Sequence, residues 1–168
     1  MKAKVECFAY FYKNKKLIAY FPTFRDGDCV YIKKLFDAFK SNEDYALIVS
    51  LHPATKSSEE YAFNGNFSTY DLAKLSDGII SDYSATAIEC SLLNKPLWFY
   101  VPDYEQYKVE KGLNIEIKNE FSKACFEDVN ELLKVVQNEA YDFDNLKRFS
   151  DKFIESKGTD NTKKLADI

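Results

Sequence analysis

A hydroxyl-rich turn is the stretch of this sequence best suited to chemistry. Residues 78–102 read GIISDYSATAIECSLLNKPLWFYVP, in which an apolar strand enters a turn at residues 82–86 and a helix follows. Such a turn places free backbone amides and the hydroxyls of Ser81, Ser84 and Thr86 at one spot, where the helix begins. The commonest anion in a crevice of an α/β protein is a phosphate. These residue types therefore predict a phosphate-binding turn.

The only histidine of the chain, His52, follows the apolar residues 45–51 and precedes Pro53. An imidazole titrates near neutral pH, so it is suited to stabilising charge on a departing phosphate. A histidine that merely ends a strand and bonds a carbonyl explains the same position without any ligand. Both interpretations are open at this point.

Two charged residues near these positions also have competing interpretations. Arg25 follows an apolar segment and offers a planar guanidinium to a phosphate, or forms an ion pair with Asp26 or Asp28. Asp82 would repel a phosphate, so we expect it to shape the turn by holding its amides or its neighbouring side chains.

Thr86 and Glu89 have the spacing of a capping box, in which each residue satisfies a free amide at the start of a helix. This box explains both residues without a ligand. It is compatible with a phosphate held by the amides of residues 83–86.

Alternating strands and helices are expected to position these residues. Apolar segments predict strands at residues 17–21, 45–51, 61–67, 78–81, 97–101 and 113–117, and helical spacing predicts helices at residues 30–39, 70–75, 87–93, 127–137, 142–156 and 159–168. This order indicates an α/β fold that is Rossmann-like, with a mostly parallel sheet and helices on both faces. Ligands of such sheets lie outside the carboxyl ends of the strands, where we expect the loops after three strands to meet.

Residues 102–112 are predicted to form a long polar loop. Tyr104, Glu105 and Tyr107 lie in it, where a base or an acceptor could bind, although an ordinary surface loop explains them as well.

Length and composition limit the possible classes of protein. The 168 residues fit one domain, here residues 17–168, preceded by a linker remnant or edge strand at residues 1–16. A net charge of -4 argues against a nucleic-acid partner. The four cysteines are far apart, and neither a signal peptide nor an apolar segment of membrane-spanning length is present, so a cytoplasmic location is expected.

Three segments together resemble a known family. YFPTFRDG at 20–27, SLHP at 50–53 and KLSDGIISDYSATAIECSLLNKPLWFYVPDYEQY at 74–107 are similar to the carboxyl-terminal domain of the CDP-glycerol glycerophosphotransferases, the teichoic-acid polymerase type. Ser81 and Ala85 replace the family's usual Thr and second Ser. The resemblance implies the donor-binding half of a GT-B glycosyltransferase.

The resemblance also implies roles for individual residues. His52 would be catalytic and would donate to the pyrophosphate of a CDP-linked donor as CMP departs. Glu89 would bond the ribose hydroxyls, as an alternative to its capping role. The residues implied in donor binding are Thr23, Arg25, Ser81, Asp82, Tyr83, Ser84, Ala85, Thr86 and Glu89. Neither a metal nor another cofactor is implied.

The implied activity is transfer of glycerol phosphate, or another polyol phosphate, to a growing teichoic-acid-like or capsular polymer. A polymer or lipid-linked acceptor would bind through an N-terminal half that this sequence lacks, so the chain alone is expected to bind donor but to be inactive. The full-length protein would be peripheral on the inner face of the cell membrane. Two alternatives are a GT-B glycosyltransferase that uses a sugar nucleotide and a non-catalytic nucleotide-binding module.

Overall fold

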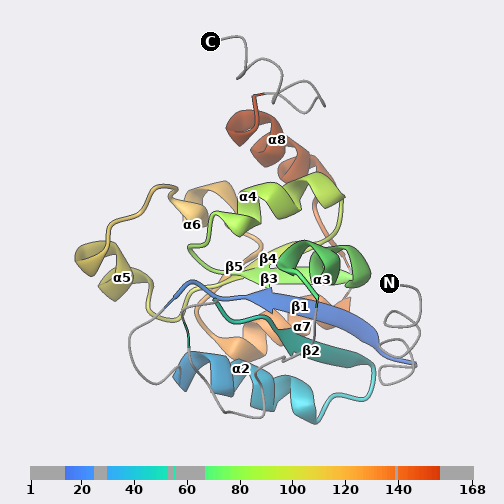
Figure 1. Ribbon diagram of the computed structural model, residues 1–168. Coiled ribbons are helices and arrows are strands. Elements are labelled where there is room, and N and C mark those ends of the chain that lie inside the picture. Colours follow the sequence, from blue (N-terminus) through green and yellow to red (C-terminus); the bar gives the residue numbers. More distant parts are fainter. Residues whose placement is uncertain (1–13, 25–29, 53–54, 56–66, 139, 156–168) are drawn as a thin grey trace.

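A five-stranded parallel sheet forms the centre of the molecule (Figure 1). The computed structural model describes residues 14–24, 30–52, 55, 67–138 and 140–155. The strands are β1 (Lys16–Phe21), β2 (Tyr45–Val49), β3 (Gly78–Ser81), β4 (Leu97–Tyr100) and β5 (Cys125–Phe126). Every neighbouring pair is parallel, so the carboxyl ends of all five strands lie at one edge.

Helices cover both faces of this sheet (Figure 1). One face carries α3 (Thr69–Leu75), α4 (Thr86–Cys90) and α8 (Phe143–Phe153), and the other carries α2 (Val30–Lys40) and α7 (Val129–Asn138). Contacts between α4 and α8 and between α2 and α7 join the helices within each layer. The Rossmann-like α/β architecture expected from the sequence is confirmed.

The sheet is apolar along its whole middle. Strands that are covered on both faces need apolar side chains at nearly every position. Accordingly β3 and β4 are buried at every position and β1 at every position except Lys16. Ile79, Phe99 and Leu97 are completely buried.

The strand order β2-β1-β3-β4-β5 reverses direction between β1 and β3. After β1 the chain crosses outward to β2, whereas after β3 it proceeds in the opposite direction to β4. The chain therefore leaves these two neighbouring strands in opposite directions, and in open α/β sheets ligands usually bind in a crevice at the carboxyl edge of such a reversal.

Two helix ends have residues that commonly mark such ends. The Ser68 hydroxyl caps α3 by accepting from the Asp71 amide, and the Asp71 carboxylate accepts from the Ser68 amide. The predicted helix at 87–93 begins one residue earlier and ends as a 3-10 turn, η1 (Ser91–Leu93). Asn94 then adopts the left-handed conformation, with φ of 50°, that commonly ends a helix.

Two expectations about residues 102–117 are wrong. The polar loop contains a helix, α5 (Tyr104–Glu110), and the predicted strand at 113–117 is irregular chain that enters α6 (Ile117–Glu120). The edge strand beside β4 is β5, which is only two residues long and thus too short to show an alternating pattern.

Some expectations fall outside the described residues. They concern residues 1–13, Asp26 and Asp28, most of the predicted strand at 61–67, and the final helix at 159–168. Phe67 is described and lies outside any strand, so the hydroxyl-rich turn follows the third described strand.

Candidate functional site

A carboxylate joins the two loops that diverge at the crevice. Asp82, directly after β3, accepts hydrogen bonds from the Thr23 amide at 2.9 and 3.0 Å and from the Thr23 hydroxyl at 2.6 Å. Asp82 is 2% exposed. Sequence reasoning expected Asp82 to hold its own turn, whereas it holds the loop after β1. The carboxylate is therefore a brace across the point where the strand order reverses.

His52 lies beside the same loop. It follows β2, it is exposed, and its ring centroid is 5.7 Å from that of Phe24, the residue after Thr23. Phe24 and Thr23 thus contact the residues that follow β2 and β3 respectively. The expected meeting of three strand-end loops is present in the described residues.

The turn after β3 places two hydroxyl residues near its surface and bonds two of its own amides. Ser84 and Thr86 are half-buried and Ala85 is exposed. The Ser84 hydroxyl accepts from the Thr86 amide at 3.3 Å, and the Ala87 amide donates to the Ser84 carbonyl at 3.1 Å. Two polar groups of this turn therefore lie near its surface, on Ser84 and Thr86.

Ser81 is placed differently from the other hydroxyl residues. Its side chain is completely buried, and its hydroxyl donates to the Phe21 carbonyl at 3.4 Å, between β3 and β1. The structure therefore brings Ser84 and Thr86 to the turn but keeps Ser81 inside the sheet.

The expected capping box of Thr86 and Glu89 is wrong. The N-cap of α4 is Ala85, in a helical conformation and without any side-chain cap. Glu89 instead accepts a hydrogen bond from the hydroxyl of Tyr70 on α3, a bond that raises the pKa of Tyr70. Sequence reasoning missed Tyr70, because nothing in the sequence shows that α3 and α4 lie side by side. The bond from Tyr70 thus replaces the capping box as the ligand-free explanation of Glu89, and the ribose role stays a prediction.

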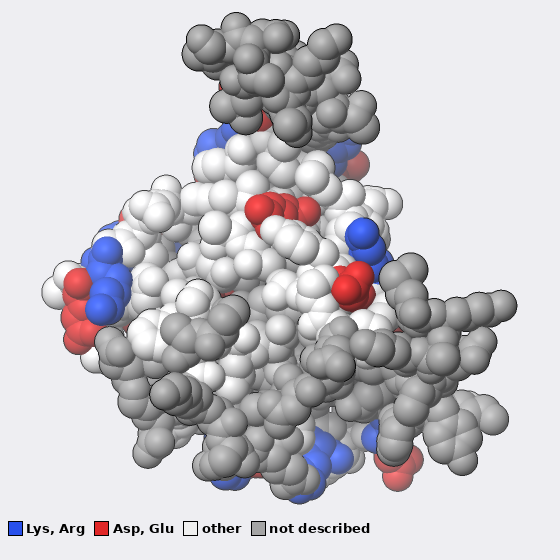
Figure 2. Space-filling view, viewed as in Figure 1, with Lys and Arg blue, Asp and Glu red and all other residues white. Residues whose placement is uncertain are grey.

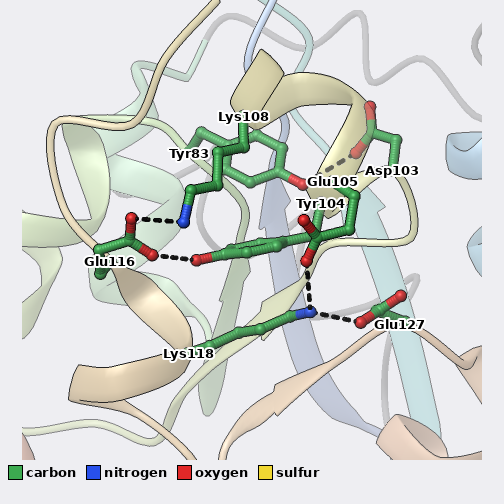
Figure 3. A network of polar contacts seen from close by, with 8 residues as sticks. All are labelled: Tyr83, Asp103, Tyr104, Glu105, Lys108, Glu116, Lys118 and Glu127. Atoms are coloured by element: carbon green, nitrogen blue, oxygen red, sulfur yellow. Dashed lines mark hydrogen bonds and ion pairs between the residues drawn. The ribbon is translucent and has the colours of Figure 1, made fainter.

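Tyr83, in the middle of the turn, is bound to α5. Its ring stacks on Tyr107, with the centroids 3.9 Å apart and the planes 11° from parallel. Its hydroxyl donates to Asp103 at 3.0 Å. Figure 3 shows this bond within a wider polar network around α5. The sequence left Tyr107 open between a ligand contact and an ordinary surface loop, and it did not indicate the contact with the turn.

Two cavities flank this tyrosine pair. The smaller, of about 100 Å³, is bordered by Ser84, Ala85 and both stacked tyrosines. The larger, of about 750 Å³, is bordered by Thr23, Asp82 and Tyr107 among others, and its size is within the usual range of small-molecule sites. A cavity of ligand size is therefore present at the carboxyl edge of the sheet, next to the Asp82–Thr23 contact.

Metal-binding side chains do not gather within the described residues. No cluster of three or more His, Cys, Asp or Glu side chains suited to a metal ion occurs there. In the view of Figure 2, the described part of the surface is largely uncharged, with acidic and basic side chains in small separate groups. Arg25 lies outside the described residues, so its phosphate contact stays a prediction.

None of the described helices has both the length and the apolar character needed to cross a membrane.

Fold and site together define a class. The chain is a doubly wound α/β domain whose loops meet at the reversal of strand order, which is the arrangement of nucleotide- and phosphate-binding domains. A model of the CDP-Glycerol:Poly(glycerophosphate) glycerophosphotransferase family matches residues 9–168. The chain belongs to this family.

Its curated relatives are considerably longer than the chain. The teichoic acid glycerol-phosphate primase of Bacillus subtilis (strain 168) is 32% identical, over 84% of this chain and 40% of the relative. The teichoic acid ribitol-phosphate primase of Bacillus spizizenii is 30% identical, over 93% of this chain and 44% of the relative. The chain thus spans less than half the length of these relatives.

Solved structures agree on the fold. The wall teichoic acid polymerase TagF matches with a TM-score of 0.64 and 22% identity, over 99% of this chain and 46% of that chain. A TagF variant soaked with CDPG matches with a TM-score of 0.65, also at 22% identity. At this level of identity the likeness concerns the fold alone.

Proposed function

We propose that this chain is the donor-binding part of a transferase that moves a polyol phosphate from CDP-glycerol, or a related CDP-polyol, to a teichoic-acid-like polymer. The observation that carries the proposal is the meeting of three strand-end loops, through the contacts His52–Phe24 and Thr23–Asp82, in a member of this family. The rest of the polypeptide would supply the acceptor site and the contact with the membrane.

The chemistry follows from these positions. A base in the rest of the polypeptide takes the proton of an acceptor hydroxyl, whose oxygen attacks the phosphorus that bears the polyol, and the bond from that phosphorus to the oxygen of CMP breaks. The leaving CMP gains negative charge, which the His52 imidazole and the amides of the turn stabilise. Thr86 and Ser84 position the diphosphate, while Glu89 bonds the ribose and Asp82 keeps the turn in place.

Thermal unfolding of the chain tests this role. CDP-glycerol is expected to raise Tm, because a ligand that binds only the folded state stabilises it. His52→Ala and Ser84→Ala should remove most of this shift. Ser122→Ala, which alters an exposed serine before β5, is the matched control and should keep it.

The choice of nucleotide separates the proposal from its alternative. CDP-ribitol is included because the relatives comprise both a glycerol-phosphate and a ribitol-phosphate primase. A shift with CDP-polyols and not with UDP-glucose supports a polyol-phosphate donor. An equal shift with UDP-glucose contradicts it and favours a sugar-nucleotide glycosyltransferase.

A further inference from the structure

Helix α5 lies at the side of the molecule and is held by side chains (Figure 1, Figure 3). Tyr104 is 3% exposed and its hydroxyl donates to Glu116 at 2.6 Å. The Lys118 ammonium lies 4.0 Å from the centre of the Tyr104 ring, and Lys108 forms an ion pair with the same Glu116 at 2.8 Å. These contacts fix α5 against α6 and the edge of the sheet.

The turn after β3 is tied to this anchored helix through one residue. Tyr83 contacts the start of α5 through its hydroxyl bond to Asp103 and the second turn of α5 through its stacking on Tyr107. The preceding residue, Asp82, is tied to Thr23 on the opposite side. Two consecutive residues of the turn are therefore held by two separate parts of the chain.

This double attachment determines where the next residues point. Ser84 follows Tyr83 directly, and both border the same small cavity. A backbone fixed at 82 and 83 holds the amide and hydroxyl of Ser84 in one orientation before any ligand arrives. Such preorganisation strengthens binding, because the ligand does not have to order the loop.

We propose that Tyr83 and Tyr107 are positioning residues for the phosphate-binding turn, so that α5 and a donor bound at the turn stabilise each other. This inference rests on the proposed function of the turn. Because coupling between two sites is reciprocal, a stack that strengthens donor binding must also make the donor stabilise α5.

Hydrogen exchange of the whole chain, read by mass spectrometry, tests the attachment. Tyr107→Leu removes the stack, and Tyr83→Phe keeps the ring but removes the hydroxyl bond to Asp103. Tyr141→Phe is the control, because it deletes a tyrosine hydroxyl that donates to Leu97 at the start of β4. Without ligand, Tyr107→Leu should accelerate exchange at residues 82–87 about two- to tenfold, as expected for the loss of one aromatic pair.

A second measurement tests the coupling. CDP-glycerol should slow exchange across α5 in the wild-type chain and much less in Tyr107→Leu, whose dissociation constant should rise by about the same two- to tenfold factor. Tyr141→Phe should match the wild type in both measurements, and Tyr83→Phe should show an intermediate effect.

The outcomes are distinct. Unchanged hydrogen exchange at residues 82–87 in both Tyr107→Leu and Tyr83→Phe overturns the inference. Unchanged affinity for CDP-glycerol in Tyr107→Leu, when the wild type binds, also overturns it. If the wild-type chain binds no CDP-glycerol, the proposed function fails, together with the coupling that rests on it. The ligand-free exchange result then still decides whether the tyrosine pair holds the turn.

Discussion

At the residue scale, Asp82 shows how a carboxylate can contribute to the proposed donor site without contacting the donor. Its two oxygens accept three hydrogen bonds from Thr23, so the carboxylate holds the neighbouring loop. Its negative charge repels a nearby phosphate, so its contribution is to position the loop and not to bind the anion.

Asp82→Asn is predicted to weaken both stability and donor binding. An amide presents one acceptor oxygen instead of two, so part of the bonding to Thr23 is lost, at a cost of about 1–3 kcal/mol in the free energy of unfolding. Urea unfolding measures this loss, and titration with CDP-glycerol measures the binding.

Asp77→Asn is the matched control for Asp82. Asp77 accepts from the Leu17 amide at 2.7 Å, at the amino end of the same strand pair. Its loss should also destabilise the fold but leave the affinity for CDP-glycerol unchanged. Equal effects of the two variants on affinity would contradict a local role of Asp82.

Tyr70 and Glu89 give a second prediction. Tyr70→Phe removes the hydrogen bond that holds the Glu89 carboxylate, which can then rotate. If Glu89 bonds the ribose, the affinity for CMP should therefore fall about two- to tenfold, the range for one lost hydrogen bond. Binding of 2′-deoxy-CMP should change less. Calorimetric titration with both nucleotides decides this, and an equal loss for both would exclude a ribose contact.

The sequence indicated the turn itself but not its partners. Ser84, Thr86 and Asp82 are recognisable because they follow an apolar strand and precede a helix. Their contacts with Thr23 and Tyr107 join residues far apart in the chain, and Tyr70 reaches Glu89 from another helix. Such contacts depend on the packing of elements, which a single sequence does not display.

At the element scale, α5 was missed for a physical reason. Only Tyr104 of its seven residues is buried, so the helix shows no apolar stripe. Its stability comes from contacts with α6, among them that of Lys118 with the Tyr104 ring. Tyr104 is buried there, and this burial raises its pKa well above the usual value. By contrast α2, α7 and α8 have apolar stripes, and their positions were predicted closely.

The attachment of α5 should depend on pH through Glu116. Hydrogen bonds from Lys108 and then Tyr104 lower the pKa of the Glu116 carboxyl from its usual 4.5. A carboxyl with a lower pKa in the folded state stabilises the fold above its usual pKa, and this stabilisation is lost as the pH falls through the lowered value. The urea midpoint of the wild type should therefore fall more below pH 4.5 than that of Glu116→Gln. Parallel pH profiles would contradict this assignment.

Lys95, in the sequence LLNKP, caps the end of α3. Its ammonium donates to the carbonyls of Ala73 at 3.1 Å and Lys74 at 2.5 Å, where a helix end favours a positive charge. Lys95→Met is predicted to lower the free energy of unfolding by about 1–3 kcal/mol, since charged hydrogen bonds are lost. Lys134→Met, which changes an exposed lysine on α7, should stay close to the wild type in the same urea titration.

At the scale of the whole molecule, the parallel sheet was predictable because strands and helices alternate in the sequence. The strand order was not, since apolar runs do not reveal which strands are neighbours. The reversal between β1 and β3 decides which loops form the crevice. The site as a spatial unit therefore became visible only with the fold.

Close packing across the middle of the sheet gives the last prediction. A Cβ atom on Gly78 would lie 2.6 Å from the Trp98 ring on the neighbouring strand. Gly78→Ala should therefore cost about 1–3 kcal/mol by overpacking. Trp98→Phe in the same chain removes the clashing part of the ring. The double variant should therefore lose less stability than the sum of the losses in the two single variants, as measured by thermal unfolding.

The amino ends and the carboxyl ends of the strands lie at opposite edges of the sheet, and this separation limits where the sequence can be altered without affecting the proposed site. The amino edge contains short turns such as residues 41–44, where the Asn42 side chain accepts from the amides of Asp44 and Tyr45. Insertions, fluorescent labels or immobilising tags placed in that turn would sit at the end of the strands away from the crevice. The loops at the amino edge can therefore be changed, by evolution or by engineering, while the residues of the proposed site at the carboxyl edge stay the same.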